Sequence, residues 1–131
     1  MLTESKYLEF LNDAISILGK KWTSEILWHL MQKPLQFSEI ESLAPGISSK
    51  MLTQRLKDLQ EYGLVTKIIL SMNPLKVSYA LSENAKTLNL LFYELSVFSL
   101  YKMGTGLSRV RAFALAKIRK DLRNFYLDAS E

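Results

Sequence analysis

The sequence predicts an α+β fold that is mostly α-helical. In this fold a helix-turn-helix is followed by an antiparallel hairpin, which belongs to a sheet of two or three strands. Two stretches support this prediction. Residues 37–63 have the pattern of a short helix, a tight turn and a longer amphipathic helix with a polar outer face. Residues 64–81 have the pattern of two strands joined by a turn. Because a helix-turn-helix with a two-stranded wing presents one helix to a groove, double-stranded DNA is the leading partner.

The length and composition of the chain limit its possible domain number and functions. Its 131 residues are enough for one domain with a proper core and too few to expect two. Hydrophobic residues make up 48% and charged residues 23%, as in a folded soluble protein. There is no cysteine and one histidine, His29, so disulfides, cysteine-based zinc sites and thiol redox sensing are not expected. The five glycines are scattered and form no phosphate-binding loop. We therefore expect no catalytic, cofactor or metal site.

The sequence also indicates a compartment. No segment approaches the roughly 20 uncharged apolar residues that a membrane helix needs. The first residues include Glu4, Lys6 and Glu9, where a signal peptide would be apolar. We expect a cytoplasmic protein without a membrane partner.

Two helices are expected before the helix-turn-helix. Thr3 can cap the first helix, and Gly19 can end it. Its apolar positions at helical spacing are Leu8, Leu11, Ile15 and Leu18. The second helix is expected at about residues 21–31, and Pro34 stops it. Residues 35–37 are then a candidate short strand.

Capping signals place the two helices of the helix-turn-helix. Ser38 and Glu41 have the spacing of a capping box, and the helix they begin ends before Pro45–Gly46. Ser48 can cap the next helix, and Gly63 can supply its left-handed closing residue. In that helix Leu52, Leu56 and Leu59 share one stripe. A turn of about 100° per residue places Lys50, Thr53, Gln54 and Lys57 on the opposite side, with Ser49 at its edge.

The hairpin and the C-terminal helices follow. Strands are expected at 65–70 and 77–81, joined by a turn at Asn73–Pro74. Ser82 and Glu83 are expected to open a long helix through about Met103, which Gly104 and Gly106 end. A final amphipathic helix is expected at about 107–127. We therefore predict a winged helix-turn-helix domain at residues 1–103 and a basic C-terminal helix at 104–131, both part of one unit.

The positive charge is concentrated in two places. Residues 48–76 hold five Lys/Arg against two carboxylates, and residues 104–131 hold six against three. Either segment could contact a polyanion. The tail helix could instead lie on an anionic membrane or form the solvated side of a dimerisation helix, and we favour the dimer.

The outer face of residues 49–57 is the candidate DNA-binding site. Thr53 and Gln54 suit base edges, and Lys50 and Lys57 suit phosphates or guanine. Ser49 lies at the edge of this face. In the wing, Asn73 and Lys76 would reach an adjacent backbone or minor groove. The alternative is that this face is simply the solvated side of an ordinary amphipathic helix.

Several segments resemble the HxlR-type winged-helix transcriptional regulators of bacteria and archaea. They are residues 17–23 (ILGKKWT), 37–40 (FSEI), 45–56 (PGISSKMLTQRL), 62–65 (YGLV) and 76–82 (KVSYALS). The resemblance implies a homodimeric DNA-binding regulator that pairs through its terminal helices and reads an imperfect palindrome. It also implies that the helix beginning near Ser48 reads DNA and that the turn at 71–76 is the wing.

The chain departs from the family pattern in two ways. Several relatives sense electrophiles or oxidants through a cysteine near the first helix, which this chain lacks. The basic helix after Gly106 also extends beyond the usual end of the domain. We predict a sequence-specific, homodimeric transcriptional regulator acting on a palindromic or pseudopalindromic operator. The alternative is a winged-helix adaptor that binds proteins without reading DNA sequence. The sequence identifies no small-molecule effector.

Overall fold

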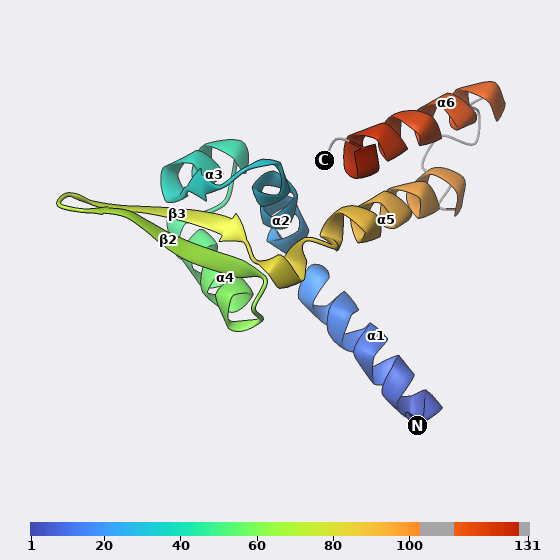
Figure 1. Ribbon diagram of the computed structural model, residues 1–131, viewed down its shortest axis with the longest axis horizontal. Coiled ribbons are helices and arrows are strands. Elements are labelled where there is room, and N and C mark those ends of the chain that lie inside the picture. Colours follow the sequence, from blue (N-terminus) through green and yellow to red (C-terminus); the bar gives the residue numbers. More distant parts are fainter. Residues whose placement is uncertain (103–111, 129–131) are drawn as a thin grey trace. The chain divides into compact units, whose positions relative to one another are not determined.

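The computed structural model describes residues 1–102 and 112–128. The chain divides into two compact units, Met1–Ala85 and Lys86–Glu131. The first unit contains the helix-turn-helix and the hairpin, and the second contains the C-terminal helices (Figure 1). The domain boundary expected after residue 103 falls at the start of a segment outside the described residues, so that division stays a prediction.

The first unit combines helices with a three-stranded antiparallel sheet, as the sequence predicts for a winged helix-turn-helix. Its elements are α1 (Glu4–Leu18), α2 (Thr23–Gln32), β1 (Leu35–Gln36), α3 (Phe37–Leu43), α4 (Ser49–Glu61), β2 (Val65–Met72), β3 (Leu75–Leu81) and a 3₁₀ turn, η1 (Glu83–Ala85). The strand order is β1-β3-β2. Both strands of the hairpin extend nearer to the predicted turn at Asn73–Pro74 than the sequence indicated.

The core of this unit joins the helices to the base of the sheet. The largest fully buried side chains are Ile26, Leu27, Leu35, Ile40, Leu52, Leu56 and Leu59. They come from α2, β1, α3 and α4. The predicted leucine stripe of α4 is therefore confirmed as its buried face.

Three helix starts differ from the predictions. Gln36, not Ser38, caps α3, and the Gln36 N–H donates to Glu39 Oε1 (2.9 Å) in a capping box two residues earlier. Helix α2 begins at Thr23 instead of Lys21, because Trp22 adopts a left-handed backbone conformation with φ 76°. No long helix starts at Ser82, because its hydroxyl donates to the Gly63 carbonyl (2.6 Å) and its N–H to the Leu64 carbonyl (3.0 Å). These bonds hold Ser82 at the end of the sheet.

The predicted cap of α4 is confirmed. Ser48 lies just before the helix, and its Oγ accepts a hydrogen bond from the Met51 N–H (3.0 Å). Gly63 closes the far end with φ 75°, the left-handed conformation that glycine adopts without steric cost. Both ends of α4 are therefore defined by local chemistry.

We expect Ser48→Ala to lower the free energy of unfolding by about 1 kcal/mol, because the Met51 N–H loses its acceptor. Thermal or urea unfolding measures this loss. Ser38→Ala is the matched control, because the Ser38 hydroxyl does not cap α3. The same loss in both variants would contradict the assignment of Ser48 as the cap.

Helix α1 is amphipathic, but none of its residues is buried within one chain. Its exposed apolar side chains are Tyr7, Leu8, Phe10, Leu11 and Ile15. An amphipathic helix normally buries its apolar stripe against another element. The apolar side of α1 thus has no partner within its own unit.

The second unit contains α5 (Leu88–Lys102), α6 (Ala112–Arg123) and a π-helical turn, η3 (Asn124–Asp128). Asn89 Nδ2 donates to the Tyr126 carbonyl (3.2 Å). The Arg119 guanidinium lies 5.9 Å from the ring centroid of Tyr101, and a hydrogen bond with Tyr93 raises the pKa of Arg119 above its ordinary value. These contacts join α5 to the C-terminal helix. The first part of the helix predicted at 107–127 lies outside the described residues.

Candidate nucleic-acid interface

Helix α4 brings five of the predicted DNA-binding residues together on one exposed surface. They are Ser49, Lys50, Thr53, Gln54 and Lys57, and all are exposed. Lys50 and Lys57 are two helical turns apart, which corresponds to about 10 Å along the helix axis. We call these five residues the α4 row. Its backing leucines are buried, so the row is held on a fixed support.

The two hydroxyl groups of the α4 row are already hydrogen-bonded. Ser49 Oγ donates to Glu41 Oε2 (2.7 Å), which ties α4 to α3. Thr53 Oγ1 donates to the Ser49 carbonyl (2.7 Å). With its hydrogen engaged, Thr53 offers an acceptor oxygen and a methyl group, and a threonine methyl can contact the methyl group of thymine.

Gln54 is oriented by a neighbour that sequence reasoning missed. Its Nε2 donates to Asp58 Oδ1 (2.8 Å), and Arg55 Nη1 donates to the other carboxylate oxygen (3.4 Å). Gln54 still has a free acceptor oxygen and a second amide hydrogen, the pair of groups that recognises adenine in the major groove. The i,i+4 spacing of Gln54 and Asp58 is a signal that could have revealed this contact.

The backbone before α2 helps to position α4. Arg55 Nε donates to the Lys21 carbonyl (2.9 Å), at the turn where Trp22 has its left-handed conformation. Gly46, in the turn between α3 and α4, has φ 94°, and a Cβ there would lie 3.7 Å from the Trp22 ring. The helix-turn-helix therefore rests on the turn at Lys21–Trp22.

The two lysines of the α4 row are available for a polyanion. Neither Lys50 nor Lys57 has a hydrogen bond or ion pair with any residue that the structure describes. Exposed, unpaired ammonium groups on a helix face can contact phosphates without first breaking an internal interaction.

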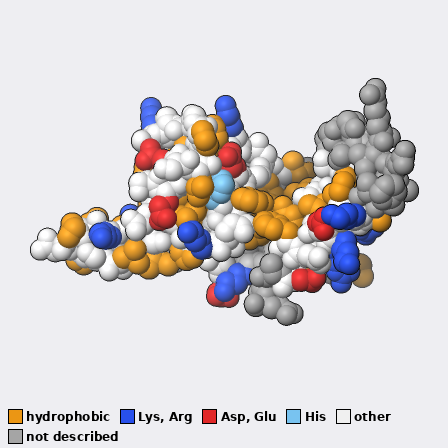
Figure 2. All heavy atoms as spheres, turned by 90° about the horizontal axis from the view of Figure 1, so that it is seen from above, with side chains coloured by type: hydrophobic (Ala, Val, Ile, Leu, Met, Phe, Trp, Pro, Cys, Tyr) orange, Lys and Arg blue, Asp and Glu red, His pale blue; other side chains and the backbone are white. Residues whose placement is uncertain are grey.

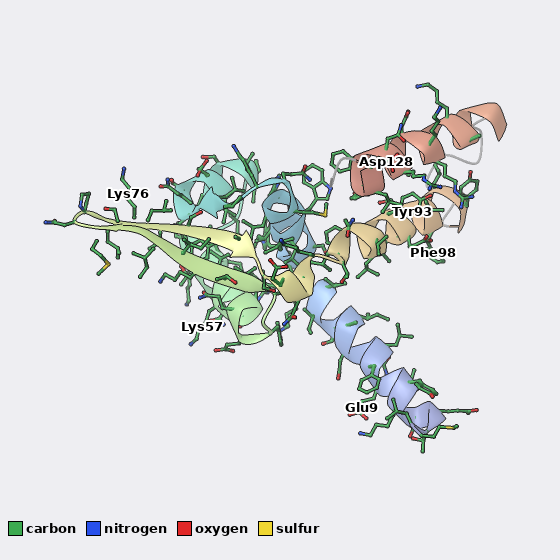
Figure 3. All side chains as sticks on the ribbon, viewed as in Figure 1. Glu9, Lys57, Lys76, Tyr93, Phe98 and Asp128 are labelled. Carbon is green, nitrogen blue, oxygen red and sulfur yellow. The ribbon has the colours of Figure 1, made fainter. Side chains whose placement is uncertain are left out.

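The hairpin does not bring its predicted residues to the α4 row. Residues paired in register lie on the same face of a sheet, so Lys76 shares a face with Ser71, its partner. In the view of Figure 3, Lys57 and Lys76 lie on opposite sides of the hairpin. Asn73 is exposed at the turn. The roles of Asn73 and Lys76 in DNA binding stay predictions.

No metal site accompanies this surface in the described part of the chain, where no group of three or more His, Asp or Glu side chains could hold a metal ion. Within residues 1–102 and 112–128, no helix is both long enough and apolar enough to span a membrane.

The helix-turn-helix, its buried leucines and the hairpin define a winged helix-turn-helix protein. The chain belongs to the HxlR-like helix-turn-helix family, whose pattern it matches over residues 17–106. This finding confirms the resemblance seen in the sequence.

Named relatives support the same assignment. The chain is 38% identical over 89 residues to the HTH-type transcriptional regulator YodB of Bacillus subtilis, covering 68% of this chain and 80% of YodB. It is 30% identical over 95 residues to the uncharacterized HTH-type transcriptional regulator YvaP of the same species, covering 72% of this chain and 88% of YvaP. The structure of reduced YodB superimposes with a TM-score of 0.66 at 34% identity, covering 79% of this chain and 99% of that one. The family and these relatives are transcriptional regulators, not enzymes, and the chain is a DNA-binding regulator of this kind.

Proposed function

We propose that the protein is a homodimeric, sequence-specific transcriptional regulator that binds a palindromic or pseudopalindromic operator. In each subunit α4 enters the major groove, with Thr53 and Gln54 toward the base edges and Lys50 and Lys57 toward the phosphates. A two-fold axis would place the two α4 helices in successive major grooves, about 34 Å apart. The observation that carries this proposal is the exposed polar α4 row on a helix whose other face is buried.

Exposed apolar surface supports the homodimer. The apolar stripe of α1 has no partner within its own unit, and on α5 Leu91, Leu95 and Phe98 are exposed at helical spacing. A two-fold interface buries the same patch on both subunits, so each exposed stripe can be covered by the partner. Helix α1 is the N-terminal helix of the described chain, and the family resemblance implies dimerisation through terminal helices.

Two substitutions on α4 test the proposed role of the row. Lys57→Ala should weaken binding to every duplex and reduce the slope of log affinity against log salt by about 1.8 for a dimer. Gln54→Ala should relax the preference at one base pair in each half-site by about 1–3 kcal/mol, with little change in the salt slope. Selection from random duplexes gives the operator, and titrations of that operator and its point variants give the affinities.

Gln60→Ala is the matched control for Gln54→Ala. Gln60 is exposed on the same helix but lies about 120° around it from Gln54. It should therefore leave both affinity and preference unchanged. If neither Lys57→Ala nor Gln54→Ala alters binding to the selected operator, α4 is not the reading helix. If the selection yields no preferred duplex, the adaptor alternative replaces this proposal.

A further inference from the structure

The tip of the β2–β3 hairpin carries large apolar side chains that are exposed. Met72 and Leu75 form the last cross-strand pair before the turn, and they are 74% and 62% exposed. Ile69, further along β2, is exposed as well. Hydrophobic side chains lie along the hairpin, at the left of Figure 2, with Lys or Arg atoms between them. Large apolar side chains in water at a strand end indicate a contact surface.

The register places these side chains on one face. Met72 pairs with Leu75, and Ile69 pairs with Val77. Because Val77 is two residues from Leu75 on β3, both pairs lie on the same side of the hairpin. The tip is also braced, since the Ser71 hydroxyl donates to the Pro74 carbonyl across the turn. The apolar side chains are thus presented on a hydrogen-bonded turn.

The charge of the hairpin points to a polyanion. Between Glu61 and Glu83 there is no carboxylate, whereas Lys67 and Lys76 are both exposed and lack an internal partner among the described residues. Lys67 pairs with Tyr79 on the face of Met72 and Leu75, and Lys76 lies on the other face. Lys76 therefore lies next to the apolar pair, and Lys67 lies further from the turn on the face of that pair. The hairpin thus presents positive charge and no carboxylate, which favours a polyanion as its partner.

We propose that Met72 and Leu75 act as an apolar wedge that enters the minor groove beside each half-site and partly unstacks one base step. This inference rests on the proposed function and deepens it. Methionine, leucine and proline are side chains that proteins insert between base steps, kinking the duplex by about 20–90° toward the major groove. The ammonium groups of Lys67 and Lys76 would contact phosphates of the same duplex.

Such a wedge adds a form of specificity that the α4 row does not supply. Pyrimidine–purine steps, TA and CA/TG, unstack most readily. The operator should therefore carry one of these steps under each wing, although no side chain there forms a hydrogen bond to a base. The sequence preference at that position would be set by the ease of deforming the duplex.

The test uses the full chain and the duplex that the wild-type protein selects from random sequences. In a series of duplexes, 2-aminopurine replaces the adenine of one TA or CA/TG step outside the half-sites at a time, and its emission reports unstacking of that step. Fluorophores on the two ends of the duplex report bending by energy transfer. Wild-type binding should raise the 2-aminopurine emission severalfold at one step per half-site and shorten the end-to-end distance. Met72→Ser with Leu75→Ser should abolish most of both signals, with the salt slope unchanged.

Two variants separate the wedge from other effects. Ile68→Ser also replaces an exposed apolar side chain by serine, but on the opposite face of the hairpin. The Ile68→Ser protein should bend the duplex as the wild type does. Lys67→Ala should lower affinity and the salt slope but retain the 2-aminopurine signal at saturating protein. Melting followed by circular dichroism verifies that each variant is folded.

The outcomes distinguish this inference from the proposed function. Selective binding by the wild type without a 2-aminopurine or bending signal would overturn the wedge and leave the regulator assignment standing. The same conclusion follows if the double variant bends the duplex as the wild type does. If the wild type selects no duplex, the proposed function fails and the wedge fails with it.

Discussion

Leu11→Asp should convert the proposed homodimer to a monomer. Leu11 is 56% exposed on α1, in the stripe that has no partner within its own unit. Burying a leucine contributes about 1.5–3 kcal/mol, and a two-fold interface buries two copies. Losing both contributions, about 3–6 kcal/mol, raises the dimer dissociation constant by a hundredfold or more. The two aspartates would add the cost of burying carboxylates. Sedimentation velocity measures the mass directly.

The same variant should lose most of its operator affinity, because a monomer engages one half-site at a time. Ser16→Asp is the matched control, since it adds the same charge to α1 about 140° around the helix from Leu11. It should remain a dimer and bind the operator normally. A Leu11→Asp protein that sediments as a dimer would show that the α1 stripe is not at the interface.

Leu52→Ala should produce the largest loss of stability in the helix-turn-helix. Leu52 is fully buried in the stripe that holds α4 against the rest of its unit. Removing a buried leucine side chain beyond Cβ costs about 2–5 kcal/mol, because the lost burial is added to the cost of the cavity. Urea unfolding, followed by circular dichroism at equal protein concentrations, measures the difference.

Leu43→Ala makes the identical change at a site on α3 that is 44% exposed. It should cost less than about 1 kcal/mol, because little burial is lost and no closed cavity forms. Equal losses in the two variants would mean that the Leu52 side of α4 is not its packed face. The α4 row would then lose its support as the DNA-reading surface.

Features with a strong local signal were predicted well. The leucine stripe of α4, its Ser48 cap and the left-handed Gly63 follow from helical periodicity and from chemistry within one or two turns. The predictions were wrong where a local signal competed with a more distant contact. Ser38 has capping-box spacing, but Gln36 caps α3 at the point where strand β1 ends. Ser82 resembles a helix start, but it bonds to the backbone near the start of β2.

At the candidate site, too, local features were predicted and contacts between distant segments were not. Helical periodicity alone placed Lys50, Thr53, Gln54 and Lys57 on one face. It did not identify Asp58, whose carboxylate accepts from both Gln54 and Arg55, or the Arg55 bond to the Lys21 carbonyl. The first contact joins neighbours on one helix, but the second joins residues far apart in the chain. In the hairpin, alternation along β2 could not show which face its last residues share, because the register has an irregularity between Ile69 and Ser71.

The sequence by itself determined the class of this protein: the order of helix, turn, helix and hairpin, the family, and the polar face of α4. These depend on the spacing of apolar residues and on turn chemistry, which act over a few residues. Only the tertiary structure decided what α4 rests on, how Gln54 is held, and which apolar side chains stay exposed on α1 and at the hairpin tip. Burial and register are set by contacts between distant segments, and a periodic pattern marks an apolar face without identifying what covers it.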